Sequence, residues 1–272
     1  MIVLDMGIVG LGVASVLTNL IFTLICAFII SRTGNFKGCT LHCFSLYKTD
    51  VAKETVKIGI VMCVQSFLVS IGALIMNKIL SSMGDDHVSA FSITTSIESL
   101  TYIVPMALCY VAQILAGKHT GAGDKRQALD ISVWVTVAST AVHIILSVFA
   151  FIFAGKLVSM YTDNEAVVTI ATETLRIGIP FMAIAWSAGN VLPAGIRGMG
   201  NVKFPAAVIT LSLWIYKIPA TWYACSFLQY GAQGRMFVYA FESVIYGALF
   251  AGYAVLVNKK IKKEKANEGI PS

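Results

Sequence analysis

Charge is what this sequence has least of. Asp, Glu, Lys and Arg make up 12% of the 272 residues and hydrophobic residues 57%, whereas about 25% of an average soluble domain is charged. This shortage, together with a mean hydropathy of +0.79, excludes an ordinary soluble domain and indicates an integral protein of the lipid bilayer. The net charge of +6 does not indicate a nucleic-acid partner, because the basic residues lie in short loops between apolar segments.

The sequence also lacks the patterns that disulfide-rich proteins, metalloproteins and hydrolases need. Four of the six cysteines lie inside apolar segments, where a free thiol behaves as a small hydrophobic group, so no disulfide framework is expected. Cys39, His42 and Cys43 supply three soft ligands, but a zinc site usually needs a fourth and none is near. No HExxH motif or Ser–His set stands at a plausible spacing, and His143 is alone in its segment. We therefore predict neither an enzyme nor a metal or cofactor site.

About 20 consecutive apolar residues span a bilayer as an α-helix, and seven segments of the chain reach that length. They lie near Ile8–Ile30, Val56–Leu80, Val88–Ala116, Ala128–Leu157, Ala166–Ile196, Phe204–Leu228 and Met236–Val257. The predicted fold class is an all-α integral membrane protein with seven transmembrane helices.

Basic and acidic residues alternate between the connections that join these segments. The first, third and fifth connections and the tail from Lys259 are basic, whereas the second and fourth hold acidic residues without Lys or Arg. By the positive-inside rule the basic connections and the C-terminus lie in the cytoplasm, and the N-terminus lies outside. We expect a multi-pass protein of the inner or plasma membrane.

An internal repeat predicts the domain organisation. The first and last segments begin alike, with Gly7-Ile-Val-Gly10 and Gly231-Ala-Gln-Gly234, and both run from outside to inside. Segments two to seven then form one six-helix unit, and the first segment is the last helix of a preceding unit. The predicted parts are the last helix of an N-terminal lobe (1–31), a cytoplasmic inter-lobe loop (32–55), a six-helix C-terminal lobe (56–258) and a basic cytoplasmic tail (259–272).

The stretch from Leu175 to Pro205 is the most irregular of the apolar segments, because it contains Pro180 and Pro193. Each proline removes a backbone hydrogen bond, and a bilayer tolerates such a break only where protein or a water-filled cavity satisfies the freed carbonyl. Broken membrane helices form the substrate sites of secondary transporters. The stretch is thus a candidate for the functional centre, with a kinked helix that merely packs as the alternative.

Polar groups within the apolar segments are candidate functional residues, because they are costly at membrane depth. Trp186 and Asn190 lie four residues apart, on one helix face between the two prolines, and with Gln65 they are candidate substrate-binding residues. Asn190 could instead serve a helix–helix contact. Glu98 and Glu242 are candidate ion-coupling residues, as proton or cation groups that face a cavity.

Two longer patterns resemble the signature stretches of the multidrug and toxic compound extrusion (MATE) family. One is the turn Ala112-Gln…Gly117-Lys…Gly121-Ala-Gly123, and the other is Arg176-Ile-Gly-Ile-Pro180…Ile196-Arg-Gly-Met-Gly200…Pro205. Members of that family have twelve helices in two six-helix lobes. The resemblance implies that this chain corresponds to helix six followed by helices seven to twelve, and that its partner would be a missing N-terminal lobe.

The resemblance also implies an activity. It implies part of an antiporter, coupled to H⁺ or Na⁺, that exports small amphipathic, often cationic compounds by alternating access. Some members carry an acidic cation site on helices seven and ten of this lobe. An ungapped alignment places Val69 and Trp186 there, and neither side chain ligates a cation. The coupling ion is therefore expected to bind largely in the missing N-terminal lobe or on other residues.

Two alternatives stay open. A flippase of lipid-linked precursors or polysaccharides shares the wider fold, but its cavity should be rich in Arg and Lys. Only Arg176 approaches membrane depth in the cavity-forming segments, by our interpretation of the sequence. The second alternative is a transport-silent fragment, because one lobe alone encloses no cavity.

Overall fold

The computed structural model describes residues 7–32 and 49–267, and every element in these ranges is a helix. Cys39, His42 and Cys43, for which no zinc site was expected, lie outside the described residues. By its internal contacts the chain divides into two compact units, Met1–Lys57 and Ile58–Ser272. Six described helices are long and apolar enough to cross a membrane, or seven with one bent pair counted as a single span. This confirms the predicted all-α membrane fold.

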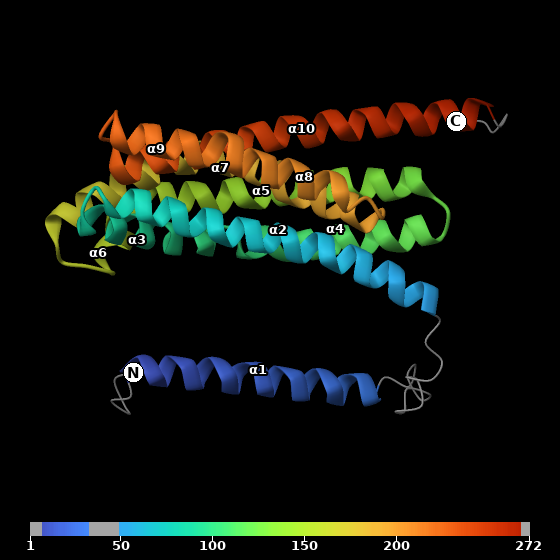
Figure 1. The fold of residues 1–272 in the computed structure, drawn as a ribbon, viewed down its shortest axis with the longest axis horizontal. Helices are drawn as coiled ribbons and strands as arrows, with labels where there is room; N and C mark the ends of the chain where they lie inside the picture. The colour runs from blue at the N-terminus through green and yellow to red at the C-terminus, as the bar shows by residue number, and fades with distance from the viewer. Residues whose placement is uncertain (1–6, 33–48, 268–272) are drawn as a thin grey trace. The chain divides into compact units, whose positions relative to one another are not determined.

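The described elements follow one another without a strand, and the long helices of the second unit run side by side (Figure 1). They are α1 (Gly7–Arg32), α2 (Thr49–Ser81), α3 (Asp85–Thr101), α4 (Ile103–Gly121), α5 (Lys125–Ile152), α6 (Ala154–Ser159), α7 (Glu165–Gly198), α8 (Lys203–Ser212), the π-helix η2 (Leu213–Lys217), α9 (Ile218–Ser226) and α10 (Gly231–Asn267).

Helix α7 is the element around which the second unit packs. It contacts α3, α4, α5, α6, α8 and α10, and small residues let these neighbours approach closely. A Cβ atom at Gly195, for example, would overlap the side chain of Ser132 on α5. The helix continues through Pro180 and Pro193 without interruption. Of the two alternatives for this stretch, the structure therefore favours a helix that continues and packs, held on several sides despite the two lost hydrogen bonds.

The span predicted as one helix from Val88 to Ala116 is instead bent by 55° between α3 and α4. Pro105 explains the bend, since it has no N–H to bond the carbonyl of Thr101 one turn earlier. The last turn of α3 is closed by two hydrogen bonds to the carbonyl of Glu98, from the Thr101 hydroxyl at 2.8 Å and the Tyr102 N–H at 3.3 Å. The bend thus places Glu98 at the end of α3.

A wide turn also interrupts the segment predicted as one helix from Phe204 to Leu228. The five residues of η2 form a π-helix, in which the Ile218 N–H bonds the carbonyl of Leu213. Pro219, directly after this turn, has no N–H of its own to continue the regular pattern. Single π-turns within helices are frequent at functional sites, and this one ends at Lys217.

Candidate functional site

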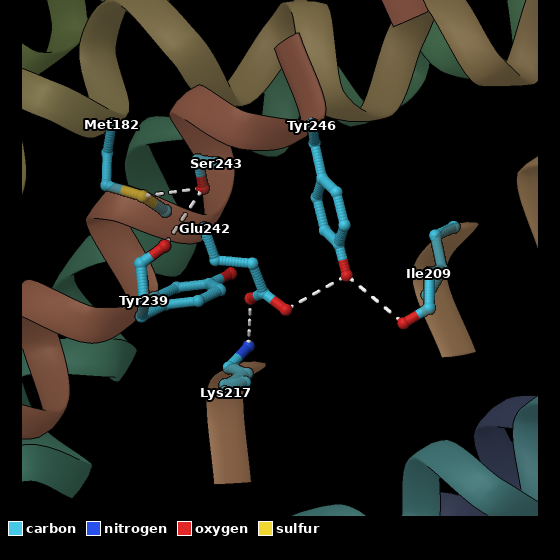
Figure 2. Close-up of polar contacts among 7 residues, drawn as sticks. All are labelled: Met182, Ile209, Lys217, Tyr239, Glu242, Ser243 and Tyr246. Carbon is cyan, nitrogen blue, oxygen red and sulfur yellow. Dashed lines mark hydrogen bonds and ion pairs between the residues drawn. The ribbon is translucent and has the colours of Figure 1, made fainter. Parts of the chain in front are cut away.

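A buried ion pair joins η2 to α10 inside the second unit. The Lys217 ammonium lies 2.6 Å from Oε2 of Glu242, whose side chain is 2% exposed, while the Lys217 side chain is 17% exposed (Figure 2). Burying either charge alone in an apolar interior is very costly, so each group keeps the other in place. The pair is a charge-neutral unit at the core of the helical bundle.

Three further side chains of α10 complete the surroundings of the pair. The Tyr246 hydroxyl donates to Oε1 of Glu242 at 2.9 Å and lies 3.3 Å from the carbonyl oxygen of Ile209. The Lys217 ammonium stands 4.1 Å from the centroid of the Tyr239 ring, a cation–π contact. Ser243, the residue after Glu242, lies with its hydroxyl 3.3 Å from the sulfur of Met182 on α7. Both carboxylate oxygens of Glu242 are therefore occupied, as Figure 2 shows.

The sequence builds this arrangement from helix spacing. Tyr239, Glu242 and Tyr246 are three and four residues apart, so they lie on one face of α10. Lys217 reaches that face from η2, where the wider π-turn shifts the register of the following residues. The sequence indicated Glu242 as a candidate residue, but it did not reveal Lys217 as its partner.

Glu98 is the second buried carboxyl group, and it differs from Glu242 in having an oxygen without a partner. Its side chain is buried, and Oε1 makes no hydrogen bond to any described residue. Gly178 on α7 makes room for it, since a Cβ atom there would stand 3.0 Å from that oxygen. A buried carboxyl group with an unoccupied oxygen has the chemistry that a proton- or cation-coupled site needs.

Trp186 is buried beside Glu98 in an aromatic cluster. Its ring stacks on Tyr102 at 5.0 Å between centroids and meets the edge of His143 at 5.6 Å. The Nε2 atom of His143 lies 3.4 Å from the Thr101 hydroxyl, at the end of α3. The cluster therefore holds the end of α3 and the bend residue Tyr102 against α5 and α7, and it places His143 within the core.

The other two candidate substrate residues take different positions. Asn190 donates from Nδ2 to the carbonyl of Trp186 at 2.9 Å, within its own helix. Gln65, half-buried on α2, has an amide oxygen that is buried and has no partner among the described residues. Of the predicted residues, the structure packs Trp186 with Tyr239, and the Tyr239 ring contacts the Lys217 ammonium that pairs with Glu242.

The sequence-based statement that only Arg176 approaches membrane depth is wrong. Lys217 is buried against Glu242, and Arg235 is 8% exposed within α10. Arg235 donates to Oδ1 of Asn77 at 2.8 Å, and its guanidinium lies 4.0 Å from the centroid of the Phe91 ring. Because both additional cations have partners, neither supplies a free basic patch for a pyrophosphate.

Comparisons with known proteins agree with this architecture. The family model described as MatE matches residues 62–223. A probable multidrug resistance protein NorM of Thermotoga maritima is 22% identical over 233 residues, which cover 85% of this chain and 49% of that protein. A protein of the same name from Bacillus subtilis is 22% identical over 231 residues, covering 84% of this chain and 51% of the relative.

Solved structures match over nearly the whole chain. A MATE in its straight conformation superposes with a TM-score of 0.83 at 15% identity, covering 96% of this chain and 58% of that one. An outward-facing multidrug resistance MATE family transporter of the MOP superfamily also superposes with a TM-score of 0.83 at 15% identity, and the match covers 95% of this chain and 58% of that one. At such identities the likeness shows the fold alone. The chain spans about half the length of the curated relatives it matches.

Proposed function

Because this chain belongs to the MatE family, the multidrug and toxic compound extrusion transporters, we propose that it forms part of a cation-coupled antiporter that exports amphipathic compounds by alternating access. Membership of a transporter family confirms the prediction that the chain is not an enzyme. The observation that carries the proposal is Glu98, a buried carboxyl group with an unoccupied oxygen at the bend between α3 and α4.

Coupling is assigned to Glu98 first and to Glu242 second. Glu98 has an oxygen free to take up a proton or a cation, and it lies where two helix segments meet at an angle that can change. Glu242 has both oxygens engaged, by Lys217 and Tyr246, so it would exchange a proton only after that pair separates. A proton or ion that binds one orientation of the helices better than the other shifts the balance between them.

The substrates we propose are small amphipathic or cationic compounds. The names of the relatives, probable multidrug resistance proteins, support drug-like molecules. Gln65, Trp186 and Asn190 remain the proposed contacts, with the buried ring of Trp186 reached only when the bundle opens. Since the chain spans about half of its relatives, we propose that an N-terminal lobe, of which α1 is the last helix, completes the cavity. That lobe would hold most of the H⁺ or Na⁺ site.

The test is export by the purified chain in proteoliposomes, alone and fused behind the first five helices of the Thermotoga maritima relative, so that α1 serves as the last helix of the N-terminal lobe. Ethidium, an amphipathic cation, is loaded and an H⁺ or Na⁺ gradient is imposed. We expect gradient-driven export in the fused form, and Glu98→Gln should reduce its rate by about 5- to 150-fold, the usual size of a coupling between two sites. Glu165→Gln, a change of an exposed acid at the start of α7, is the matched control.

The outcomes separate the readings of the chain. Export that is unchanged in Glu98→Gln would remove the coupling role from that residue while leaving the transporter in place. Absence of export from both forms, with folding shown by a cooperative thermal transition, would favour the transport-silent alternative. Movement of a lipid-linked precursor in place of ethidium would favour a flippase.

A further inference from the structure

A pocket of about 710 Å³ lies between α7, the η2–α9 segment and α10. Small-molecule sites typically enclose about 300–1,000 Å³, so the pocket has the size of one drug-like ligand. Aromatic rings form much of its wall, contributed by Phe181, Tyr216, Tyr223, Tyr230 and Phe237. The rings of Phe181 and Phe237 meet edge to face at 6.2 Å between centroids. Such walls suit a flat aromatic body.

Arg176 is the one charged side chain among the described residues that line this pocket. No hydrogen bond or ion pair joins it to another described residue. The acidic neighbour on its own helix, Glu173, is engaged elsewhere, because Oε2 accepts a hydrogen bond from the Gln233 amide at 3.1 Å. The guanidinium therefore faces the pocket without an ion-pair partner among the described residues.

This charge decides which ligand the pocket prefers. Aromatic faces carry a partial negative charge and attract cations, but a full positive charge nearby outweighs that attraction and repels an organic cation. A guanidinium binds a carboxylate through two parallel hydrogen bonds, with both strength and directional selectivity. Arg176 thus favours a ligand with an anionic group at the end of an aromatic body.

We propose that this pocket binds small amphipathic aromatic anions, with the rings of α7, α9 and α10 holding the apolar body and Arg176 holding the carboxylate. The inference rests on the proposed export function and names a second substrate class for it, beside the cations expected there. The Lys217–Glu242 pair is not needed, since neither residue lines the pocket and each charge already has the other as its partner.

The test compares two probes that share one ring and differ in charge. Naphthalene-2-carboxylate and naphthalen-2-ylmethylammonium are titrated calorimetrically into the purified 272-residue chain in a neutral detergent. We expect the carboxylate to bind at least several-fold more tightly. Arg176→Gln should weaken the carboxylate about tenfold, the lower end expected for a charge-assisted hydrogen bond at an exposed group, and should abolish the preference. Arg176→Lys should keep part of it.

Two control variants locate the effect. Lys156→Gln removes a positive charge from α6, which packs on α7 outside the pocket, and should change neither affinity. Phe181→Ala removes part of the aromatic wall and should weaken both probes equally. Equal affinities in the unmodified chain, the same loss in Lys156→Gln as in Arg176→Gln, or unchanged binding in Phe181→Ala would each overturn the proposal.

A lipid could present the same chemistry, an anionic group on an apolar body. The competition test adds equimolar phosphatidylglycerol to the chain. If the lipid abolishes naphthoate binding, the pocket is a lipid pocket, and the assignment to small aromatic anions is overturned. Binding does not depend on transport, so the two proposals fail separately. Naphthoate selectivity without any export contradicts the proposed function, and ethidium export without naphthoate selectivity contradicts this inference alone.

Discussion

At the scale of single residues, the ion pair between Lys217 and Glu242 makes a sharp prediction about stability. Lys217→Met should leave a buried carboxylate without its partner, and breaking a buried pair costs about 3–5 kcal/mol. Because the Lys217 side chain is 17% exposed, we expect the lower part of that range. Thermal or denaturant unfolding in detergent micelles measures the effect.

The double change Lys217→Met with Glu242→Leu should recover most of the loss, since replacing both charges by apolar groups is often neutral. Arg126→Gln is the control. It removes a surface pair with Asp130 that is 4.0 Å long, and such pairs contribute about 0–1 kcal/mol. A double variant as unstable as Lys217→Met alone would contradict the account of the pair.

These residues also show where the sequence stopped being informative. Glu98 and Glu242 were predicted from the cost of charge in a bilayer, a property of each residue by itself. The partner of Glu242 depends on which faces of η2 and α10 meet, and the π-turn that sets this register follows no apolar periodicity. Lys217 was therefore overlooked, although it lies in the middle of a predicted span.

At the scale of elements, the bend between α3 and α4 should depend on Pro105. Pro105→Ala restores an N–H that can bond the carbonyl of Thr101, so the two helices should straighten. With 1.5 Å of rise per residue and the 55° bend, spin labels at Val88 and Ile114 should move apart by roughly 4 Å.

Pulsed electron–electron double resonance, in a variant without other cysteines, measures the distance between the two spin labels. Val104→Ala, next to the proline, is the matched control and should leave the distance unchanged. If Pro105→Ala also leaves it unchanged, packing of α4 against α5 and α7 holds the bend, and the proline is only compatible with it.

The sequence gives the position of each proline, but it does not show whether the helix bends there. A break of α7 at Pro180 and Pro193 was one of two alternatives, and the helix continues through both. Pro105 was not expected to interrupt its span, yet the chain bends there. Helix α7 is packed on several neighbours, which stabilise one continuous helix, whereas the α3–α4 segment has fewer such contacts. A proline lowers the cost of a bend, and tertiary packing decides whether the bend occurs.

At the scale of the whole molecule, hydropathy alone predicted the fold class, because a bilayer requires each span to satisfy its own backbone. The direction of the spans comes from a different signal, the alternation of basic and acidic connections, and it makes a prediction of its own.

Alkaline phosphatase, active only outside the cytoplasm, should be active when fused after Ser82, between α2 and α3, and inactive when fused after Gly121 or at the C-terminus. Green fluorescent protein should show the reverse pattern. The reason is that the connection after Gly121 and the tail from Lys259 are basic, whereas the connection near Ser82 holds Asp85 and Asp86. Replacing Asp85 and Asp86 by Asn is the control and should leave the pattern intact, since acidic residues contribute little to orientation. An active phosphatase at the C-terminus would reverse the orientation of every span, and would put the pocket at Arg176 on the cytoplasmic side of the bilayer instead of the outer side.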